Sequence, residues 1–234
     1  MIPKIIHFCW FGKNKYPNYV VNCINSWKKH CPDYEIKLWN EQNYDVNKNQ
    51  FIAQAYKQKK WAFVSDYARL DIVNQYGGFY LDTDVELVKS LQELESLSCF
   101  FAADEGGINT GLGFGSSNSH AILIEMMKEY EQKEFIVNGI IDYSPCTVIN
   151  TKVFTIRGYS VNKSIQIFDG IHVFPAEYFS PIVGSNSSFN ITENTIGIHL
   201  SSRSWERPVT RIKARLRLLL GIKAVSRLKF FLNK

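Results

Sequence analysis

The stretch YGGFYLDTDVELVKS, Tyr76 to Ser90, ends an apolar run with two aspartates one residue apart. Its two glycines are typical of residues that stop a helix, and Phe79–Leu81 then has the pattern of a short buried strand. A buried carboxylate is costly unless another group pairs with it. The stretch therefore raises the question of what compensates Asp82 and Asp84.

Alternating helix and strand patterns surround this stretch. The apolar spacing predicts strands at 2–10, 34–39, 79–81, 99–103, 109–115, 165–168, 171–174 and 196–200, and helices at 17–30, 50–58, 61–76, 120–132 and 146–157. The chain thus begins as a β-α-β unit, which favours an α/β fold with a mainly parallel sheet covered by helices.

Length and composition indicate one globular domain with an appendage. The chain has 234 residues, 45% of them hydrophobic and 21% charged. The net charge of +5 comes from the C-terminus: residues 211–234 hold eight Lys/Arg and no Asp/Glu, which leaves 27 − 8 = 19 basic against 22 acidic residues elsewhere. A uniformly basic nucleic-acid-binding surface is therefore excluded.

The five cysteines do not form a recognisable framework. Their number is odd and no pair has CxxC spacing, so neither a disulfide scaffold nor a zinc site is expected. We expect buried free thiols in a reducing compartment. No stretch approaches ~18 uninterrupted apolar residues and the N-terminus lacks the apolar core of a signal peptide, so a cytoplasmic location is expected.

The acid pair has the chemistry of a metal site. Ligands of open α/β sheets bind beyond the carboxyl ends of the strands, and side chains at i and i+2 point the same way while a strand continues. Two carboxylates suit Mn²⁺ or Mg²⁺ together with a diphosphate. The expected answer is that a metal compensates Asp82 and Asp84; a solvated pair of loop acids is the alternative.

The preceding helix carries a second polar pair. Asp66 and Arg69 are three residues apart, so they share one helix face that leads to the two glycines and the acid pair. Arginine suits phosphate and sugar oxygens, and aspartate suits sugar hydroxyls. An ordinary surface ion pair is the alternative.

Together these residues form a longer pattern. The stretch SDYARLDIVNQYGGFYLDTD, Ser65 to Asp84, resembles the DxD-containing "sugar-binding region" glycosyltransferases, which include outer-chain-initiating α-mannosyltransferases and bacterial capsular polysaccharide transferases. It is also similar to the core of the large clostridial glucosylating toxins. The opening IPKIIHFCWFG looks like the first strand of the same group. The resemblance covers residues 1–115 well and the rest thinly.

The resemblance implies a nucleotide-diphospho-sugar transferase of the GT-A type, Rossmann-like, over residues 1–207. Asp66 and Arg69 would hold the donor sugar and its diphosphate, and Trp10 would stack on the nucleobase. Tyr80 would lie beside the ribose and the diphosphate. Asn109, in INTGLGFG, would touch the donor sugar. The alternatives are a core tryptophan, a core strand tyrosine and a bulged strand that needs small residues.

The resemblance also implies a metal-binding set. Asp84 would ligate Mn²⁺ or Mg²⁺ directly, and Asp82 would contact ribose or sugar hydroxyls and the metal. His199, in IGIHLSSRSW, would be a further metal ligand, while Ser202 and Trp205 would lie near the diphosphate. A structural histidine at a strand end is the alternative for His199.

The implied chemistry is departure of a nucleoside diphosphate. A divalent cation and Arg69 would stabilise the negative charge that develops on the leaving phosphate. The group is of the retaining kind, and no certain carboxylate nucleophile is present, which favours a front-face displacement. A double displacement through Glu105 or Asp104 stays open.

The C-terminal segment 208–234 mixes cations with aliphatic residues and is expected to be a basic amphipathic helix. Such segments bind anionic membrane surfaces, which would place the protein on the inner face of the cell membrane with a lipid-linked oligosaccharide or growing surface glycan as acceptor. An ordinary helix that packs on the domain is the alternative.

The donor and the function class have alternatives. Stacking on Trp10 suits uracil, so UDP-galactose or UDP-glucose is expected first and GDP-mannose second. A metal-dependent phosphotransferase would carry its DxD after the first strand, whereas this pair follows residue 80. A non-catalytic sugar-nucleotide binder would hold the donor without turnover.

Overall fold

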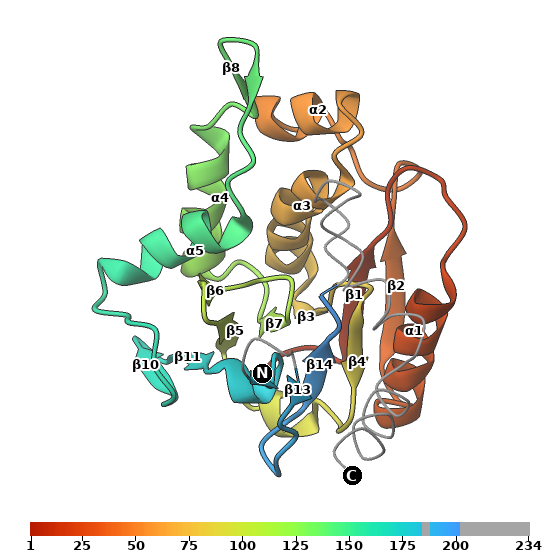
Figure 1. Cartoon of the computed structure of the whole chain (residues 1–234), viewed down its shortest axis with the longest axis vertical. Helices are drawn as coiled ribbons and strands as arrows, with labels where there is room; N and C mark the ends of the chain where they lie inside the picture. Colours follow the sequence, from red (N-terminus) through yellow and green to blue (C-terminus); the bar gives the residue numbers. More distant parts are fainter. Residues whose placement is uncertain (184–187, 202–234) are drawn as a thin grey trace, which may run out of the picture.

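The computed structural model describes residues 1–183 and 188–201, and the chain forms one central sheet with helices on its faces (Figure 1). The helices are α1 (Asn18–His30), α2 (Gln50–Lys57), α3 (Trp61–Tyr76), α4 (Ala121–Glu131) and α5 (Cys146–Thr155). The sheet strands are β1 (Ile5–Cys9), β2 (Glu35–Trp39), β3 (Gly78–Tyr80), β5 (Cys99–Asp104), β6 (Gly107–Ile108), β7 (Phe114–Ser116), β10 (Gln166–Phe168) and β11 (Ile171–Phe174).

The sheet is mixed and mainly parallel. Its order is β10-β11-β5-β7-β3-β1-β2, with β6 paired to β5. β1 pairs in parallel with β2 and β3, and β11 pairs in parallel with β5. β7 runs antiparallel to both of its neighbours, β3 and β5, so β3 and β5 point the same way. The carboxyl ends of β1, β3 and β5 therefore meet at one edge of the sheet.

Two apolar cores lie on opposite faces of the sheet because successive strand residues alternate in direction. Phe101 belongs to the core under α2, α3, α4 and α5, while its neighbour Phe100 belongs to the core that includes Trp27 of α1. Helix α3 is buried along most of its length, from Phe63 to Val73. A helix buried all round needs partners for its polar side chains, and Asp66 and Arg69 find them at the site described below.

A small second sheet carries a site residue to the edge of the main one. Strand β14 (Gly197–His199) pairs antiparallel with β4 (Val85–Leu87), with His199 opposite Val85. The indole nitrogen of Trp27 on α1 donates to the Val85 carbonyl at 2.8 Å, which ties this sheet to the helix. The remaining short elements are β8 (Ile136–Val137), β9 (Ile140–Ile141), β12 (Ile182–Val183), β13 (Ser188–Phe189) and the 3-10 helices η1 (Gln92–Leu94) and η2 (Ala176–Tyr178).

Most predicted elements are confirmed; two predicted strands differ, and short elements such as β4, β8 and β9 were not predicted. The segment 109–115 is mainly loop, and strand β7 begins only at Phe114. The predicted strand at 196–200 forms β14, but it pairs with β4 rather than joining the main sheet. Four cysteines are buried as expected, whereas Cys146 is only partly buried. The predicted basic segment 208–234 lies outside the described residues.

No helix within the described ranges combines the length and the apolar character needed to span a bilayer.

Candidate active site

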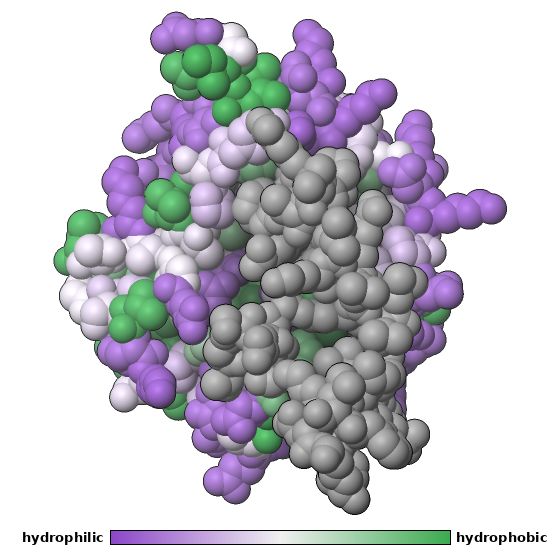
Figure 2. Space-filling model, viewed as in Figure 1, coloured by the Kyte–Doolittle hydropathy of each residue, from purple (hydrophilic) through white to green (hydrophobic). Residues whose placement is uncertain are grey.

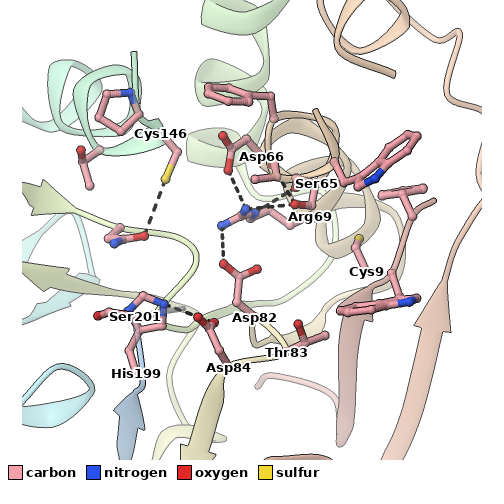
Figure 3. Close-up of a pocket in the computed structure, with 18 of the residues that line it drawn as sticks. Cys9, Ser65, Asp66, Arg69, Asp82, Thr83, Asp84, Cys146, His199 and Ser201 are labelled. Carbon is pink, nitrogen blue, oxygen red and sulfur yellow. Dashed lines mark hydrogen bonds and ion pairs between the residues drawn. The ribbon is translucent and has the colours of Figure 1, made fainter. Parts of the chain in front are cut away.

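A pocket of about 710 Å³ lies at the carboxyl ends of the parallel strands (Figure 3). It gathers most of the residues that the sequence singled out, although they come from separate elements. The lining includes Trp10, Asp66, Arg69, Asp82, Asp84, Asn109 and His199. The position agrees with the general rule for ligand sites in α/β sheets.

Arg69 is the electrostatic centre of the pocket. Its side chain extends from α3 and is almost fully buried. Its Nε donates to the Ser65 carbonyl at 2.9 Å, and its Nη2 donates to Asp66 Oδ1 at 2.6 Å. Its Nη1 lies 3.6 Å from Asp82 Oδ2 (Figure 3). The guanidinium therefore bridges the carboxylate of α3 and the first carboxylate of the DxD motif.

This arrangement sets the protonation of the buried groups. Burial raises the pKa of Asp66 to about 6, although the Arg69 guanidinium opposes the rise. Burial also raises the pKa of Asp82, again against the effect of Arg69, and the nearby Asp84 carboxylate adds to the rise. The two carboxylates keep Arg69 charged, with a pKa well above its usual value despite its burial.

Asp82 is held by protein groups on each oxygen. The Tyr80 hydroxyl donates to its Oδ1 at 2.9 Å, while its Oδ2 faces Arg69. The Tyr80 ring lies under the guanidinium, with 5.1 Å from Arg69 Cζ to the ring centroid. Tyr80 is fully buried and does not line the pocket. Tyr80 holds Asp82 by a hydrogen bond and supports Arg69 with its ring, from a position outside the pocket. The predicted direct contact of Tyr80 with ribose and diphosphate therefore has no support in this geometry.

Asp84 pairs with His199. His199 Nε2 lies 3.2 Å from Asp84 Oδ1, and its Nδ1 lies 3.3 Å from the Ser201 hydroxyl. Burial would lower the pKa of His199, but the neighbouring carboxylates, Asp84 first, raise it above its ordinary value. The compensation expected from a metal alone is thus shared by protein groups: Arg69 and Tyr80 for Asp82, and His199 for Asp84.

Three of these side chains also have the arrangement of a metal-binding set. Asp82, Asp84 and His199 each offer one ligand atom, and all three atoms lie within 4.8 Å of one another. Two carboxylates and one imidazole suit Mn²⁺ or Mg²⁺, with the imidazole favouring Mn²⁺. The donor set therefore fits the divalent cation expected from the sequence.

Asp82 and Asp84 both face the pocket, but not for the predicted reason that they are two residues apart on one strand. Residues 81–84 are not strand; they form a turn in which the Val85 amide donates to the Asp82 carbonyl at 3.0 Å. The Asp82 amide is fixed from the other side by the Gly111 carbonyl at 3.2 Å. A turn, and not an extended i and i+2 spacing, thus brings both carboxylates to the pocket.

The predicted sugar contact Asn109 lines the pocket beside Asp104. Its Nδ2 donates to Asp104 Oδ2 at 2.8 Å, and its Oδ1 accepts from the Gly111 amide at 3.0 Å. Asp104 lines the pocket, whereas Glu105 is exposed and does not. The structure therefore does not bring Glu105, the predicted catalytic acid, to the site; Asp104 is the carboxylate beside Asn109.

Trp10 lines the pocket at the end of β1. Its indole nitrogen donates to the Asn14 carbonyl at 2.7 Å, and the Tyr16 ring meets it edge-on at 5.1 Å between centroids. The loop turns at Gly12, where φ is +93° and an added Cβ would lie 2.6 Å from the Trp61 indole. A partly exposed, oriented indole is compatible with base stacking, which stays a prediction.

Some residues of the pocket were missed, and two predicted residues fall outside the description. Cys146 begins α5 and its thiol lies 3.6 Å from Asn109 Oδ1; no spacing in the sequence indicates that this cysteine faces a ligand site. Lys15 and Trp61 also line the pocket. Trp61, one helical turn before Ser65 on the same helix, could have been noticed. Ser202 and Trp205 lie outside the described residues.

Comparison with known proteins gives related sequences. The family model described as glycosyltransferase sugar-binding region containing DXD motif matches residues 17–101. The uncharacterized glycosyltransferase L373 of Acanthamoeba polyphaga mimivirus is 34% identical over 220 residues, covering 88% of this chain and 84% of the relative. Inositol phosphoceramide mannosyltransferase 3 of Schizosaccharomyces pombe is 30% identical over 144 residues, 57% of this chain; the match spans 38% of that longer protein.

Solved structures with low sequence identity share the fold. A galactosyltransferase, LgtC, solved with donor and acceptor sugar analogs, has a TM-score of 0.51 at 15% identity, covering 92% of this chain and 94% of that one. A glycosyltransferase involved in glycosylation of the major capsid of PBCV-1 has a TM-score of 0.53 at 12% identity, covering 94% and 100%.

Proposed function

Because this chain belongs to the glycosyltransferase family whose sugar-binding region contains the DXD motif, and has the GT-A fold, we propose a specific transfer. It moves a hexose from a UDP-sugar to a lipid-linked or polysaccharide acceptor, with retention of the α-configuration, in the synthesis of a capsular or other surface glycan. The observation that carries the proposal is the meeting of Asp82, Asp84 and His199 beside Arg69 in one pocket.

A divalent cation, Mn²⁺ first and Mg²⁺ second, would be held by Asp84, His199 and Asp82. When bound, it would supply positive charge to the leaving diphosphate. The loss of the Asp84–His199 ion pair on binding is compensated because both side chains gain the cation as partner. Asp82 keeps its Tyr80 and Arg69 contacts and so presents a carboxylate of fixed orientation.

The chain's own cation adds to this effect. Arg69 is preorganised by Ser65, Asp66 and Asp82, so it needs no rearrangement when negative charge develops in the pocket. Asp66 and Asn109 lie on either side and have free acceptor or donor capacity for sugar hydroxyls. These positions support binding of the hexose between α3 and the loop before β7.

The position of the carboxylates distinguishes between the two mechanisms that would both retain the α-configuration. Asp104 is the acid beside Asn109 in the pocket wall, and both of its oxygens already accept hydrogen bonds, from Gly106 N at 2.8 Å and Asn109 Nδ2 at 2.8 Å. Such a carboxylate is a weak nucleophile. A front-face displacement, in which the leaving diphosphate helps to deprotonate the acceptor, is therefore preferred to a double displacement through Asp104.

One alternative nucleotide-sugar donor, GDP-mannose, is favoured by a specific observation. Two relatives in the comparisons are named inositol phosphoceramide mannosyltransferases, which supports GDP-mannose as donor. The proposed stacking on Trp10 supports a uridine nucleotide. The names of these relatives also support a lipid acceptor, and with it a peripheral position on the inner face of the cell membrane through the basic segment 208–234.

A donor screen tests the proposal. UDP-galactose, UDP-glucose and GDP-mannose are each incubated with Mn²⁺ or with EDTA, and release of nucleoside diphosphate is measured for the wild type and for Asp84→Asn. We expect slow Mn²⁺-dependent hydrolysis of one UDP-hexose and a loss of at least about 100-fold in the variant.

Two results would contradict the proposal. Hydrolysis of GDP-mannose alone would contradict the proposed UDP-sugar donor but would still support a transferase activity. Absence of hydrolysis, together with no change in melting temperature on adding any donor with Mn²⁺, would exclude a donor site in this pocket. Glu105→Gln serves as a matched control, because Glu105 lies nearby but does not line the pocket.

A further inference from the structure

A short hairpin outside the pocket exposes apolar side chains. β8 and β9 pair with Val137 opposite Ile140 and Ile136 opposite Ile141. The turn residues Asn138 and Gly139 have φ of 52° and 78°, the positive values of a type I′ hairpin. Neighbouring strand residues face opposite sides: Ile136 and Ile141 pack against the core, whereas Val137 and Ile140 are 50% and 73% exposed.

The outward pair is unusual for a hairpin in water. An outward-facing strand position normally carries a polar side chain, and apolar groups gathered on a projecting element mark a contact site. Figure 2 shows hydrophobic surface gathered at the end of the molecule where Figure 1 draws β8. The hairpin therefore offers an apolar tip with no partner among the described residues.

A run of lysines borders this tip. Lys57 and Lys59 are exposed and Lys60 is partly buried, and the sequence has no Asp or Glu from 46 to 65. Lys60 Nζ lies 5.0 Å from the centre of the Tyr143 ring, which follows β9 and is 45% exposed. We call Lys57, Lys59, Lys60, Val137, Ile140 and Tyr143 the docking face.

Other contacts hold the two parts of the docking face together. The Ile136 amide donates to Gln54 Oε1 of α2 at 2.9 Å, and α2 and β8 lie at the same end of the molecule (Figure 1). Of the nearby acids, Asp142 is paired with Lys133, and Glu134 is exposed. Cations thus exceed free carboxylates around the apolar tip.

The docking face adjoins the pocket. Trp61, which lines the pocket, directly follows Lys60, and the lining residue Pro145 comes two positions after Tyr143. A molecule held against the docking face is therefore presented at the pocket wall.

We propose that the docking face binds an anionic lipid surface, with Val137 and Ile140 entering the membrane interface and the lysines contacting the headgroups. A few apolar side chains with adjacent cations suffice for interfacial binding. A stable protein–protein interface needs about 1,200–2,000 Å², far more than two aliphatic side chains and a ring provide. The purpose of this contact rests on the proposed membrane-anchored acceptor.

A local fluorescence probe tests the contact in the full-length chain. An environment-sensitive fluorophore is attached at Ile140→Cys in a Cys146→Ala background, because the other described cysteines are buried. We expect a blue shift on adding phosphatidylglycerol–phosphatidylethanolamine vesicles and none with phosphatidylcholine vesicles. The matched control is Ile156→Cys, at the end of α5, where the isoleucine is 79% exposed, and its probe should not shift.

Charge removal gives a second measurement. Lys57→Gln with Lys59→Gln should raise the lipid concentration at half-maximal shift by roughly tenfold or more. No shift at position 140, an equal shift at position 156, or an equal response to phosphatidylcholine would overturn the proposal.

Donor hydrolysis by the wild-type chain without vesicles separates the two proposals, because Cys146, which is replaced in the labelled proteins, lines the pocket. A blue shift without hydrolysis would support membrane binding by the docking face and contradict the proposed transferase activity. Hydrolysis without a blue shift would support the transferase activity and contradict membrane binding by the docking face.

Discussion

At the scale of single residues, the pocket depends on charges that neutralise one another. Arg69 is 2% exposed and contacts two acids, Asp66 and Asp82. Removing the arginine alone would leave the buried Asp66 carboxylate without its ion-pair partner and would remove one of the two groups that hold Asp82, which is strongly destabilising. Loss of activity in Arg69 variants would therefore mix catalysis with folding, so a substitution that disturbs the geometry without removing a charge is more informative.

Gly111→Ala is such a substitution. A Cβ at this position would lie 2.4 Å from Asp82 Oδ2 and 3.0 Å from Arg69 Nη1, so Asp82 must move although no charge is lost. Misplacement of about 1 Å in a site can cost ~100-fold in rate. We expect kcat/KM for donor hydrolysis to fall by about that factor, while the melting temperature changes little.

Gly106→Ala, in the loop that follows β5 and lines the pocket wall, is the control. There an added Cβ approaches Asp104 Oδ1 at 3.1 Å and otherwise meets Thr147 at 3.7 Å or beyond. We expect an effect of less than about tenfold. Equal losses in both variants would mean that any added methyl group on this wall inhibits the reaction, and that the position of Asp82 is not decisive.

At the scale of elements, a three-residue strand delivers His199 to the acid pair. β14 pairs only with β4 among the described strands, and the His199 amide donates to the Phe179 carbonyl at 2.9 Å. An added Cβ at Gly197 would lie 2.9 Å from the Phe179 ring. A larger side chain there should displace the strand, and with it the imidazole.

We therefore expect Gly197→Val to weaken Mn²⁺ binding by about 10- to 100-fold, as loss of a supporting contact at a metal site does. Isothermal titration of Mn²⁺ in the presence of UDP measures it. Ile198→Val, one position on, is the control: this isoleucine is fully buried, so the change costs ~1 kcal/mol of stability without moving the histidine. Unchanged Mn²⁺ affinity in Gly197→Val would show that His199 does not contribute to the metal site.

The sequence predicted the long elements better than the short ones. The apolar spacing located the five helices of the described residues within one or two residues, although α3 is buried on nearly all sides and not along one stripe. The hairpin at 136–141 was missed despite its Asn-Gly turn signal. β4 was also missed, since three residues carry almost no periodicity and this strand exists through its distant partner β14.

The site was predicted only in part, because sequence patterns report on residues that are close in the chain. Local patterns placed Asp66 with Arg69 and Asp82 with Asp84, because neighbours in sequence stay neighbours in space. Cys146 was missed because it reaches the pocket only through the packing of α5, which no local spacing encodes. Asp104 was a candidate beside Glu105, and only the fold shows that Asp104 and not Glu105 lines the pocket. The turn at 82–85 likewise depends on the contact of Asp82 with Gly111 across the sheet.

At the scale of the whole molecule, a histidine joins three strands of the sheet. His7 on β1 is fully buried. The Trp39 indole of β2 donates to its Nδ1 at 3.1 Å, and its Nε2 lies 2.8 Å from the Gly77 carbonyl, just before β3. An indole N–H can only donate and a carbonyl can only accept, so the imidazole is neutral with its proton on Nε2.

This buried imidazole makes the stability of the fold depend on pH. Burial lowers the pKa of His7 to about 4, and the nearby Lys37 lowers it further while the Gly77 carbonyl opposes the change. The pKa in the unfolded chain is about 6.5, so the unfolded state binds the proton more tightly. The stabilising contribution is complete above pH 6.5 and is lost as the pH falls through 4.

The expected loss is about 2 kcal/mol in the free energy of unfolding between pH 7.5 and pH 5, measured by urea denaturation. The difference between the wild type and His7→Gln isolates this histidine, because glutamine can donate and accept but does not titrate. The wild-type curve should fall more steeply with acid than the variant's. Parallel curves, or an NMR titration in which the His7 ring protonates near pH 6.5, would mean that the sheet tolerates a charged imidazole between β1, β2 and β3.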